Sequence, residues 1–229
     1  MSIVEFDPRV RTPDREQWRY TARPEWSSAG ESLWMRLSKF SHCNRMSVAE
    51  LARLLAHQGD RAAFTGIDLR CMTAWVTESI ATRLEISADD VRASFCCAEP
   101  HVLTMRACTE LRYCVRCLQA GFHTAWFQWL VVERCPLHDA SLRTGCVRCA
   151  AAIPYALCAQ QLALSPLRCT ACQYDWVPTL ARPSGRCTPL ADREAELMRR
   201  WADCADDSVA IAGRNGRDRK PANTSALDR

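Results

Sequence analysis

Four pairs of metal-binding side chains, each pair spaced by two residues, most constrain how this 229-residue chain can fold. In chain order the pairs are Cys114–Cys117, Cys135–His138, Cys146–Cys149 and Cys169–Cys172. A tight turn with this spacing directs two ligands at one metal ion, and two such turns complete the tetrahedron that zinc requires. The pattern therefore predicts two structural zinc ions. The expected ligand sets are Cys114, Cys117, Cys135 and His138 for the first ion, and Cys146, Cys149, Cys169 and Cys172 for the second.

The order of the pairs along the chain also allows a second distribution of the four pairs between the two metal ions. Cys135 and His138 would then bind one ion together with Cys146 and Cys149, and the two outer pairs would bind the other. His123 also lies between the first two pairs, but we favour His138 because it repeats the two-residue spacing. In every arrangement each ion receives four protein ligands, which leaves no open position for water or substrate. The ions are therefore expected to stabilise the fold.

The cysteine content and the N-terminus bear on the cellular compartment. Fifteen residues are cysteine, and the first 20 residues are charged and lack the apolar core of a secretory signal. No stretch approaches the roughly 18 apolar residues of a membrane-spanning helix. We therefore expect a cytoplasmic chain without membrane contact, whose thiols bind metal or pack in the core. The cysteines expected to be buried packing residues are Cys43, Cys71, Cys96, Cys97, Cys108, Cys158, Cys187 and Cys204.

The charge balance does not point to strong nucleic-acid binding. Thirty basic and 26 acidic side chains leave a net charge of +4. Residues 101–175 carry seven arginines and four acids, but seven thiolates and two zinc ions would cancel this excess. A sequence-independent grip on DNA needs a surplus of positive charge. Contact with nucleic acid would require a local patch, for which the candidates are Arg112, Arg116, Arg143 and Arg148.

The first hundred residues show helical periodicity. Apolar residues between Leu33 and Phe40 recur with helical spacing and form one stripe. The capping box Ser47-Val-Ala-Glu50 predicts the start of a second helix, which Gly59 should end. These signals predict a small all-helical unit.

Residues 77–95 fit the shape of a helix-turn-helix, with predicted helices over 73–84 and after Ser87. The turn holds Glu85 where glycine is usual. The second helix opens with Asp89-Asp90, which would repel phosphate and disfavour entry into the major groove. We therefore expect the shape of this motif without DNA reading by it.

Together these patterns predict a mainly α fold with small zinc-ribbon modules. An N-terminal helix-turn-helix-like unit should be followed by two tandem zinc fingers and a C-terminal helix. The expected boundaries are 1–27 for an N-terminal arm, 28–105 for the helical unit, 106–145 and 146–180 for the two fingers, 181–204 for the C-terminal helix and 205–229 for a disordered tail.

The segment Leu111–Tyr155, LRYCVRCLQAGFHTAWFQWLVVERCPLHDASLRTGCVRCAAAIPY, resembles the core of TniQ/TnsD-type transposition proteins. That family shows an R-Y-C-x-x-C-L opening, an aromatic stretch, C-P-x-H, a C-x-x-C and a further C-x-x-C downstream. The upstream segment Glu31-Ser-Leu-Trp-Met-Arg-Leu37 is similar to the family's E-S-L-x-x-W-L-x-R-L helix, with the tryptophan shifted to Trp34. The resemblance covers about residues 28–178.

The resemblance implies a non-enzymatic adaptor in DNA transposition, which links target-site recognition to an AAA+ ATPase regulator. The implied partners are that ATPase and target DNA, with a guide RNA or CRISPR effector in some members. The eight ligands named above match the family's zinc-finger positions. The alternative is a stand-alone zinc-containing DNA- or RNA-binding regulator. A zinc enzyme would need an open coordination position and a general base in a pocket, and the sequence shows no pattern for either.

Overall fold

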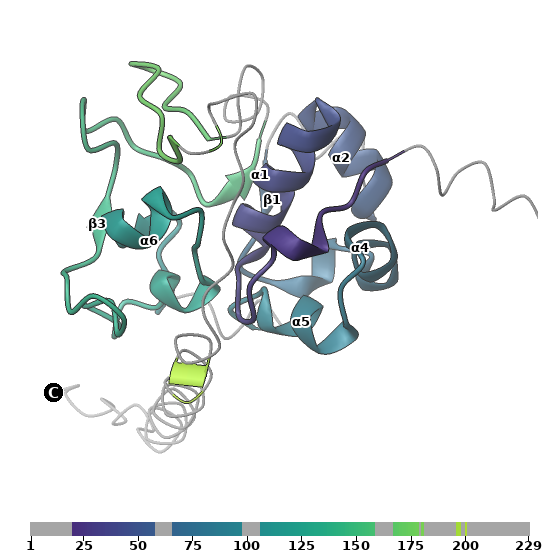
Figure 1. The fold of residues 1–229 in the computed structure, drawn as a ribbon, viewed down its shortest axis with the longest axis horizontal. Helices are drawn as coiled ribbons and strands as arrows, with labels where there is room; N and C mark the ends of the chain where they lie inside the picture. The colour runs from purple at the N-terminus through teal and green to yellow at the C-terminus, as the bar shows by residue number, and fades with distance from the viewer. Residues whose placement is uncertain are drawn as a thin grey trace, which may run out of the picture.

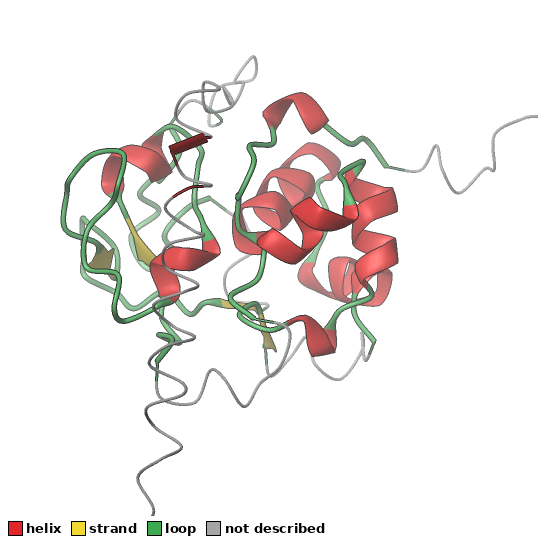
Figure 2. Ribbon diagram, turned by 90° about the horizontal axis from the view of Figure 1, so that it is seen from below, coloured by secondary structure: helices red, strands yellow, loops and turns green. Residues whose placement is uncertain are grey.

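The computed structural model describes residues 20–57, 66–97, 106–158, 167–178, 180, 196–197 and 200. Helices α1, α2, α4 and α5 gather on one side of the molecule, and the cysteine-rich segment, which is mostly loops, forms the other side (Figure 1 and Figure 2). The mainly helical class with small sheets and two cysteine-rich clusters confirms the coarse prediction. The expected tail, most of the expected arm and most of the C-terminal helix lie outside the described residues, although residues 196, 197 and 200 are helical.

The helices and strands of the described residues are short, with 12 residues in the longest, and loops connect them. The helical side contains η2 (Pro24–Trp26), α1 (Leu33–Asn44), α2 (Val48–Leu55), η3 (Met72–Ala74), α4 (Thr77–Leu84) and α5 (Ala88–Ala93). The cysteine-rich side contains α6 (Val115–Gln119) and η5 (Ala125–Gln128). Strand β1 (Ile67–Asp68) pairs antiparallel with β4 (Ala156–Leu157), and β2 (Arg112–Tyr113) pairs antiparallel with β3 (Arg143–Thr144). No helix in this part of the chain is long and apolar enough to span a membrane.

Helix α1 is the central element of the fold. Ser32 caps its N-terminus, because the Ser32 Oγ accepts a hydrogen bond from the Met35 N–H at 3.3 Å. The predicted apolar stripe is buried, and the burial extends beyond it to every residue from Leu33 to Ser41. Two charged side chains on this helix, Arg36 and Lys39, are only 2% and 5% exposed. Helix α1 is therefore covered on all sides.

The capping box of α2 is confirmed. Ser47 and Glu50 exchange side chain-to-backbone hydrogen bonds in both directions. The helix ends at Leu55, four residues before the predicted stop, because the Leu55 carbonyl accepts from the Val76 N–H and Ala56 pairs with Trp75. The same pairing interrupts the helix predicted over 73–84, so that α4 begins only at Thr77.

Helices α4 and α5 pack against each other through a tight turn. Glu85 takes the left-handed conformation, with φ of 54°, at the position where glycine is usual. Ser87 caps α5 by accepting from the Asp90 N–H at 3.0 Å. Helix α5 has only six residues, and its acidic first turn carries Asp89 and Asp90. Both its length and its acidic start differ from a recognition helix that enters a major groove.

The two sides of the molecule share one hydrophobic core. Leu33 and Leu51 from the helical side lie in the same buried cluster as Tyr155 and Trp176 from the cysteine-rich side. Pairing of β1 with β4 joins the two sides by backbone hydrogen bonds. A second, smaller cluster surrounds Cys114, Cys117 and Cys135 with aromatic side chains.

Candidate metal centres

The structure gathers the eight predicted ligands into two separate groups. One group contains Cys114, Cys117, Cys135 and His138, and the other contains Cys146, Cys149, Cys169 and Cys172. Within each group the ligand atoms all lie within 4.8 Å of one another. Cys135 and His138 therefore lie with the first pair, and the alternative sharing with Cys146 and Cys149 is not what the structure shows.

The distances within the first group fit a tetrahedral ion. The His138 Nδ1 lies 3.5 Å from the Cys114 Sγ, 3.2 Å from the Cys117 Sγ and 3.6 Å from the Cys135 Sγ. Tetrahedral bonds of about 2.3 Å to sulfur and about 2.0 Å to nitrogen would place a sulfur and a nitrogen ligand about 3.5 Å apart, and two sulfur ligands about 3.8 Å apart. All three contacts lie close to these values, so the group needs little rearrangement to hold a metal ion.

The second group has a similar spacing and a more exposed position. The Cys146 and Cys172 Sγ atoms are 3.6 Å apart, as are those of Cys149 and Cys169. Cys149 is exposed, whereas the three cysteines of the first group are all buried. Both groups could hold a metal ion, and the second would exchange its ion with solvent more readily.

Three of the four ligand pairs sit in the same backbone turn. In each turn the N–H of the first ligand donates to the carbonyl five residues later, and the N–H four residues later donates back to the first ligand's carbonyl. These turns begin at Cys135, Cys146 and Cys169, with N···O distances between 2.8 and 3.0 Å. The residue after the second ligand takes a positive φ in each, at Asp139, Ala150 and Gln173. The turn explains why two-residue spacing directs both ligand atoms to one point.

The first pair is built differently. Cys114 is the N-cap of α6, and Cys117 lies within that helix. Two residues of separation also place two side chains on one face of the first helical turn. The Cys117 carbonyl then accepts from the Phe122 N–H at 2.9 Å, which ends the helix. The expectation of four equivalent turns therefore needs correction at this pair.

In each group, hydrogen bonds lower the pKa of one cysteine thiol. Hydrogen bonds from the Cys117 and Cys135 thiols hold the pKa of Cys114 well below its usual range, while the same contacts raise the pKa of Cys117. In the second group, burial opposes ionisation of Cys146, but the backbone N–H groups of Arg148 and Cys149 outweigh it and lower its pKa to about 7. Each group thus offers a thiolate near neutral pH, which is the form that binds metal.

Gly145 joins the two groups and fixes the start of the second. The Tyr113 hydroxyl, next to Cys114, donates to the Gly145 carbonyl at 2.7 Å. Gly145 has φ of 68°, and a Cβ there would lie 2.9 Å from the Ala150 carbonyl oxygen. An alanine would therefore push Ala150 away and distort the turn that begins at Cys146.

We expect Gly145→Ala to destabilise the chain by about 2 kcal/mol or more, because backbone strain adds to the clash. The second group should release its metal at a lower chelator concentration than the first. Chemical unfolding and stepwise metal release to a chromogenic chelator measure both effects.

Gly30→Ala is the matched control, since Gly30 has φ of 69° but no atom of the described residues within 4 Å of its Cβ position. It should cost only the left-handed penalty of about 1 kcal/mol, with metal release unchanged. Equal costs for the two variants would contradict the role of the Ala150 contact.

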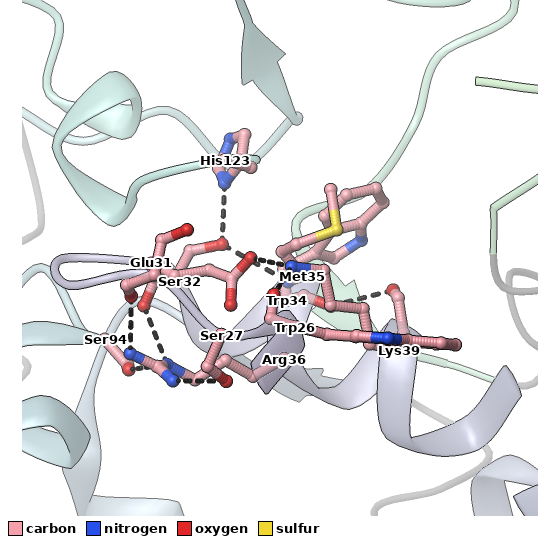
Figure 3. A network of polar contacts seen from close by, with 12 residues as sticks. Trp26, Ser27, Glu31, Ser32, Trp34, Met35, Arg36, Lys39, Ser94 and His123 are labelled. Carbon is pink, nitrogen blue, oxygen red and sulfur yellow. Dashed lines mark hydrogen bonds and ion pairs between the residues drawn. The ribbon is translucent and has the colours of Figure 1, made fainter. Parts of the chain in front are cut away.

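His123, the competing ligand, lies in neither group. It is fully buried, and its Nδ1 lies 2.7 Å from the Ser32 Oγ (Figure 3). Its Nε2 lies 2.9 Å from the Arg112 carbonyl oxygen. A carbonyl can only accept, so Nε2 carries the proton and Nδ1 accepts from the Ser32 hydroxyl. The Ser32 N–H also donates to the His123 carbonyl at 2.7 Å. These hydrogen bonds of His123 therefore connect the start of α1 to the cysteine-rich side.

Burial lowers the pKa of His123 from 6.5 to about 4, although its hydrogen bond to the Arg112 carbonyl opposes the shift. The unfolded chain binds this proton near pH 6.5, whereas the folded chain binds it only near pH 4, so acidification between these values favours unfolding. We expect about 3 kcal/mol of stability to be lost across this window. Urea unfolding at several pH values should show that His123→Asn is less stable at pH 7.5 but has a smaller pH slope. The exposed His57 provides the control variant His57→Gln, which should keep the wild-type slope.

A buried network of charges surrounds the N-terminal half of α1 and was not predicted from the sequence (Figure 3). Glu31 is fully buried and forms an ion pair with Lys39, whose Nζ also donates to the Trp26 carbonyl at 2.6 Å. The Arg36 guanidinium donates to the Ser94 hydroxyl and to the Ser27 hydroxyl, each at 3.0 Å. These bonds connect η2, α1 and the end of α5. The sequence carries no local signal of this network, because charged residues on a helix normally face solvent.

The candidate arginine patch is reduced to three residues. Arg112 turns inward, where its guanidinium donates to the Trp129 and Val132 carbonyls. Arg116, Arg143 and Arg148 are exposed, and none forms an ion pair with an acid in the described residues. Arg143 pairs with Tyr113 between strands β3 and β2, and Tyr113 precedes Arg116 by three residues. Arg116 lies between the ligands Cys114 and Cys117, and Arg148 lies between Cys146 and Cys149, so each metal group carries one exposed arginine within a ligand pair.

No protein-family model and no curated protein sequence matches this chain.

Proposed function

We propose that both groups bind zinc. Seven thiolates and one imidazole are the donors that zinc prefers, whereas magnesium and calcium prefer oxygen. The ligands that would hold the first ion are Cys114, Cys117, Cys135 and His138, and those for the second are Cys146, Cys149, Cys169 and Cys172. Each ion would be fully coordinated by protein, so it would supply structural cross-linking.

We further propose that the chain is a non-enzymatic adaptor in DNA transposition of the TniQ/TnsD type. One observation carries this proposal: the two segments that bear the resemblance pack into each other. Ser32, in the upstream segment, exchanges two buried hydrogen bonds with His123, which lies between the first two ligand pairs. Two separate motifs that complete one buried interface are consistent with a single functional unit.

The electrostatics favour a protein partner over autonomous DNA reading. Helix α5 begins with two acids, and Asp90 lies 3.6 Å from the buried Arg36. This helix is therefore held in the fold by its acidic end and is poorly suited to phosphate. The proposed partner is an AAA+ ATPase regulator of transposition, and the chain would connect it to target DNA or to a guide-RNA complex.

Recovery of a tagged chain from its native host, with and without nuclease, tests the adaptor role. We expect mass spectrometry to identify an AAA+ ATPase that remains bound after nuclease treatment. Recovery of nucleic acid without any ATPase would replace the adaptor with a stand-alone regulator. Failure to recover either partner with zinc-loaded protein would contradict both roles.

One observation supports the alternative, a stand-alone regulator: Arg116, Arg143 and Arg148 are exposed. If these side chains contact phosphate, the triple Arg→Gln variant should bind duplex DNA more weakly and lower the slope of log K against log salt by about 3. Titrations at several salt concentrations measure this slope. The control is Arg134→Gln, because Arg134 is exposed but paired with Asp139. An unchanged slope in the triple variant would remove the patch as a nucleic-acid surface.

A further inference from the structure

Cysteines outside both metal groups meet where the segment after β1 contacts the segment after α5. Cys71 and Cys97 are Cα partners in a parallel β-bridge. The N–H groups of Cys96 and Cys97 both donate to the Arg70 carbonyl, at 2.9 and 3.2 Å. Paired strands lie about 4.8 Å apart, and a disulfide needs a Cα separation of about 4.4 to 6.8 Å. Directly paired residues project to the same face of a ladder, so the backbone holds these two side chains at a separation that a disulfide can span. The Cys71 Sγ lies 3.4 Å from the Thr73 Oγ1 and the Cys97 Sγ lies 3.9 Å from the Arg70 carbonyl oxygen, so both side chains must rotate for the two sulfurs to bond.

The neighbouring Cys96 is not suited to the same chemistry. Its thiol is buried and donates to the Ala125 carbonyl at 3.3 Å, and burial raises its pKa well above the usual range. Consecutive Cα atoms are only about 3.8 Å apart, which is below the range for a disulfide between Cys96 and Cys97. Cys97 is half-buried, so solvent reaches it, whereas Cys71 is buried. The geometry therefore selects the pair Cys71–Cys97.

We propose that Cys71 and Cys97 form a thiol-oxidation site, which a peroxide converts to a disulfide. The Cys97 thiol ionises, its thiolate attacks one peroxide oxygen, and the O–O bond breaks, so that Cys97 becomes a sulfenic acid and the other oxygen leaves as hydroxide, which takes up the proton released by the Cys97 thiol and becomes water. The Cys71 sulfur then attacks the Cys97 sulfur, the S–O bond breaks, and hydroxide leaves with the Cys71 proton as a second water. Two thiols are oxidised and one peroxide is reduced. This site goes beyond the proposed function and does not depend on it.

The bond would tie together the segments that flank α4 and α5. Both helices lie in the loop of residues 72–96 that it closes. A cross-link over a loop of this length restricts the unfolded chain and stabilises the native one. We expect the thermal midpoint to rise by about 5 °C or more.

The test treats the reduced, zinc-loaded full chain with stoichiometric hydrogen peroxide, blocks the remaining thiols by alkylation and maps the peptides by mass spectrometry. We expect a Cys71–Cys97 cross-link with the loss of two hydrogens, retention of both zinc ions and a higher thermal midpoint. Cys71→Ser and Cys97→Ser should each abolish the cross-link, and Cys71→Ser should leave Cys97 as a sulfenic acid that dimedone traps. The matched control Cys96→Ser should still form it.

The wild-type peptide map decides the question even if a variant fails to fold. The proposal is overturned if both thiols are recovered alkylated while zinc is released. It is equally overturned if Cys97 is joined to Cys96 or Cys108.

Discussion

Replacement of Cys117 by serine is expected to reduce the zinc content from two ions to one and to abolish cooperative unfolding of the cysteine-rich side. Cys117 is 1% exposed and contacts both Cys135 and His138. Structural zinc contributes about 10 to 16 kcal/mol to folding in zinc-finger peptides, which exceeds the usual net stability of a domain. Loss of the ion should therefore expose the aromatic cluster around Phe127 and Trp129. Metal analysis, near-ultraviolet circular dichroism and thermal melting measure these effects.

The matched control for this prediction is Cys158→Ser. Cys158 is half-buried on the same side of the molecule and belongs to neither metal group. This variant should keep two zinc ions and a cooperative transition. A Cys117→Ser protein that also keeps both would contradict the assignment of the first group.

Replacement of Lys39 by methionine is expected to cost about 3 to 5 kcal/mol, because it leaves the Glu31 carboxylate buried without its ion-pair partner. Glu31 is fully buried, and its Oε2 already has no hydrogen-bond partner among the described residues. Removing both charges together avoids the uncompensated ion. The double variant Lys39→Met/Glu31→Gln should therefore be more stable than Lys39→Met alone. Urea unfolding of the two variants and the wild type measures the difference.

An exposed ion pair provides the contrast. Arg92 contacts Asp89, but their side chains are 61% and 87% exposed. Arg92→Met should leave the unfolding midpoint unchanged, because exposed pairs contribute little. A Lys39→Met variant as stable as Arg92→Met would mean that Glu31 is not held as a buried charge.

The sequence was sufficient to predict the metal groups because their geometry is local. Two-residue spacing determines where the side chains of a pair point, and the turns at Cys135, Cys146 and Cys169 form through short-range hydrogen bonds. The same spacing is compatible with a helix, which is why the helical setting of Cys114 and Cys117 was not distinguished. The caps at Ser47 and Ser87 were also predictable from adjacent residues.

The buried polar contacts could not be predicted, because they depend on segments that are distant in the chain. His123 and Ser32 are 91 residues apart, and neither carries a local signal of its partner. Charged residues such as Arg36 and Lys39 normally mark a solvent-facing side of a helix. Only the packing of α5 and the cysteine-rich side around α1 shows that these charges are internal. The pairing of Ala56 with Trp75 is also a contact between distant segments. It ends α2 at Leu55 and delays the start of α4 to Thr77.

Zinc K-edge X-ray absorption on the purified chain tests the central claim most directly. We predict two zinc ions per chain that share seven sulfur ligands and one nitrogen ligand, with sulfur at about 2.3 Å and no bound water. A well-folded chain without zinc would contradict the account. So would a spectrum dominated by nitrogen and oxygen ligands.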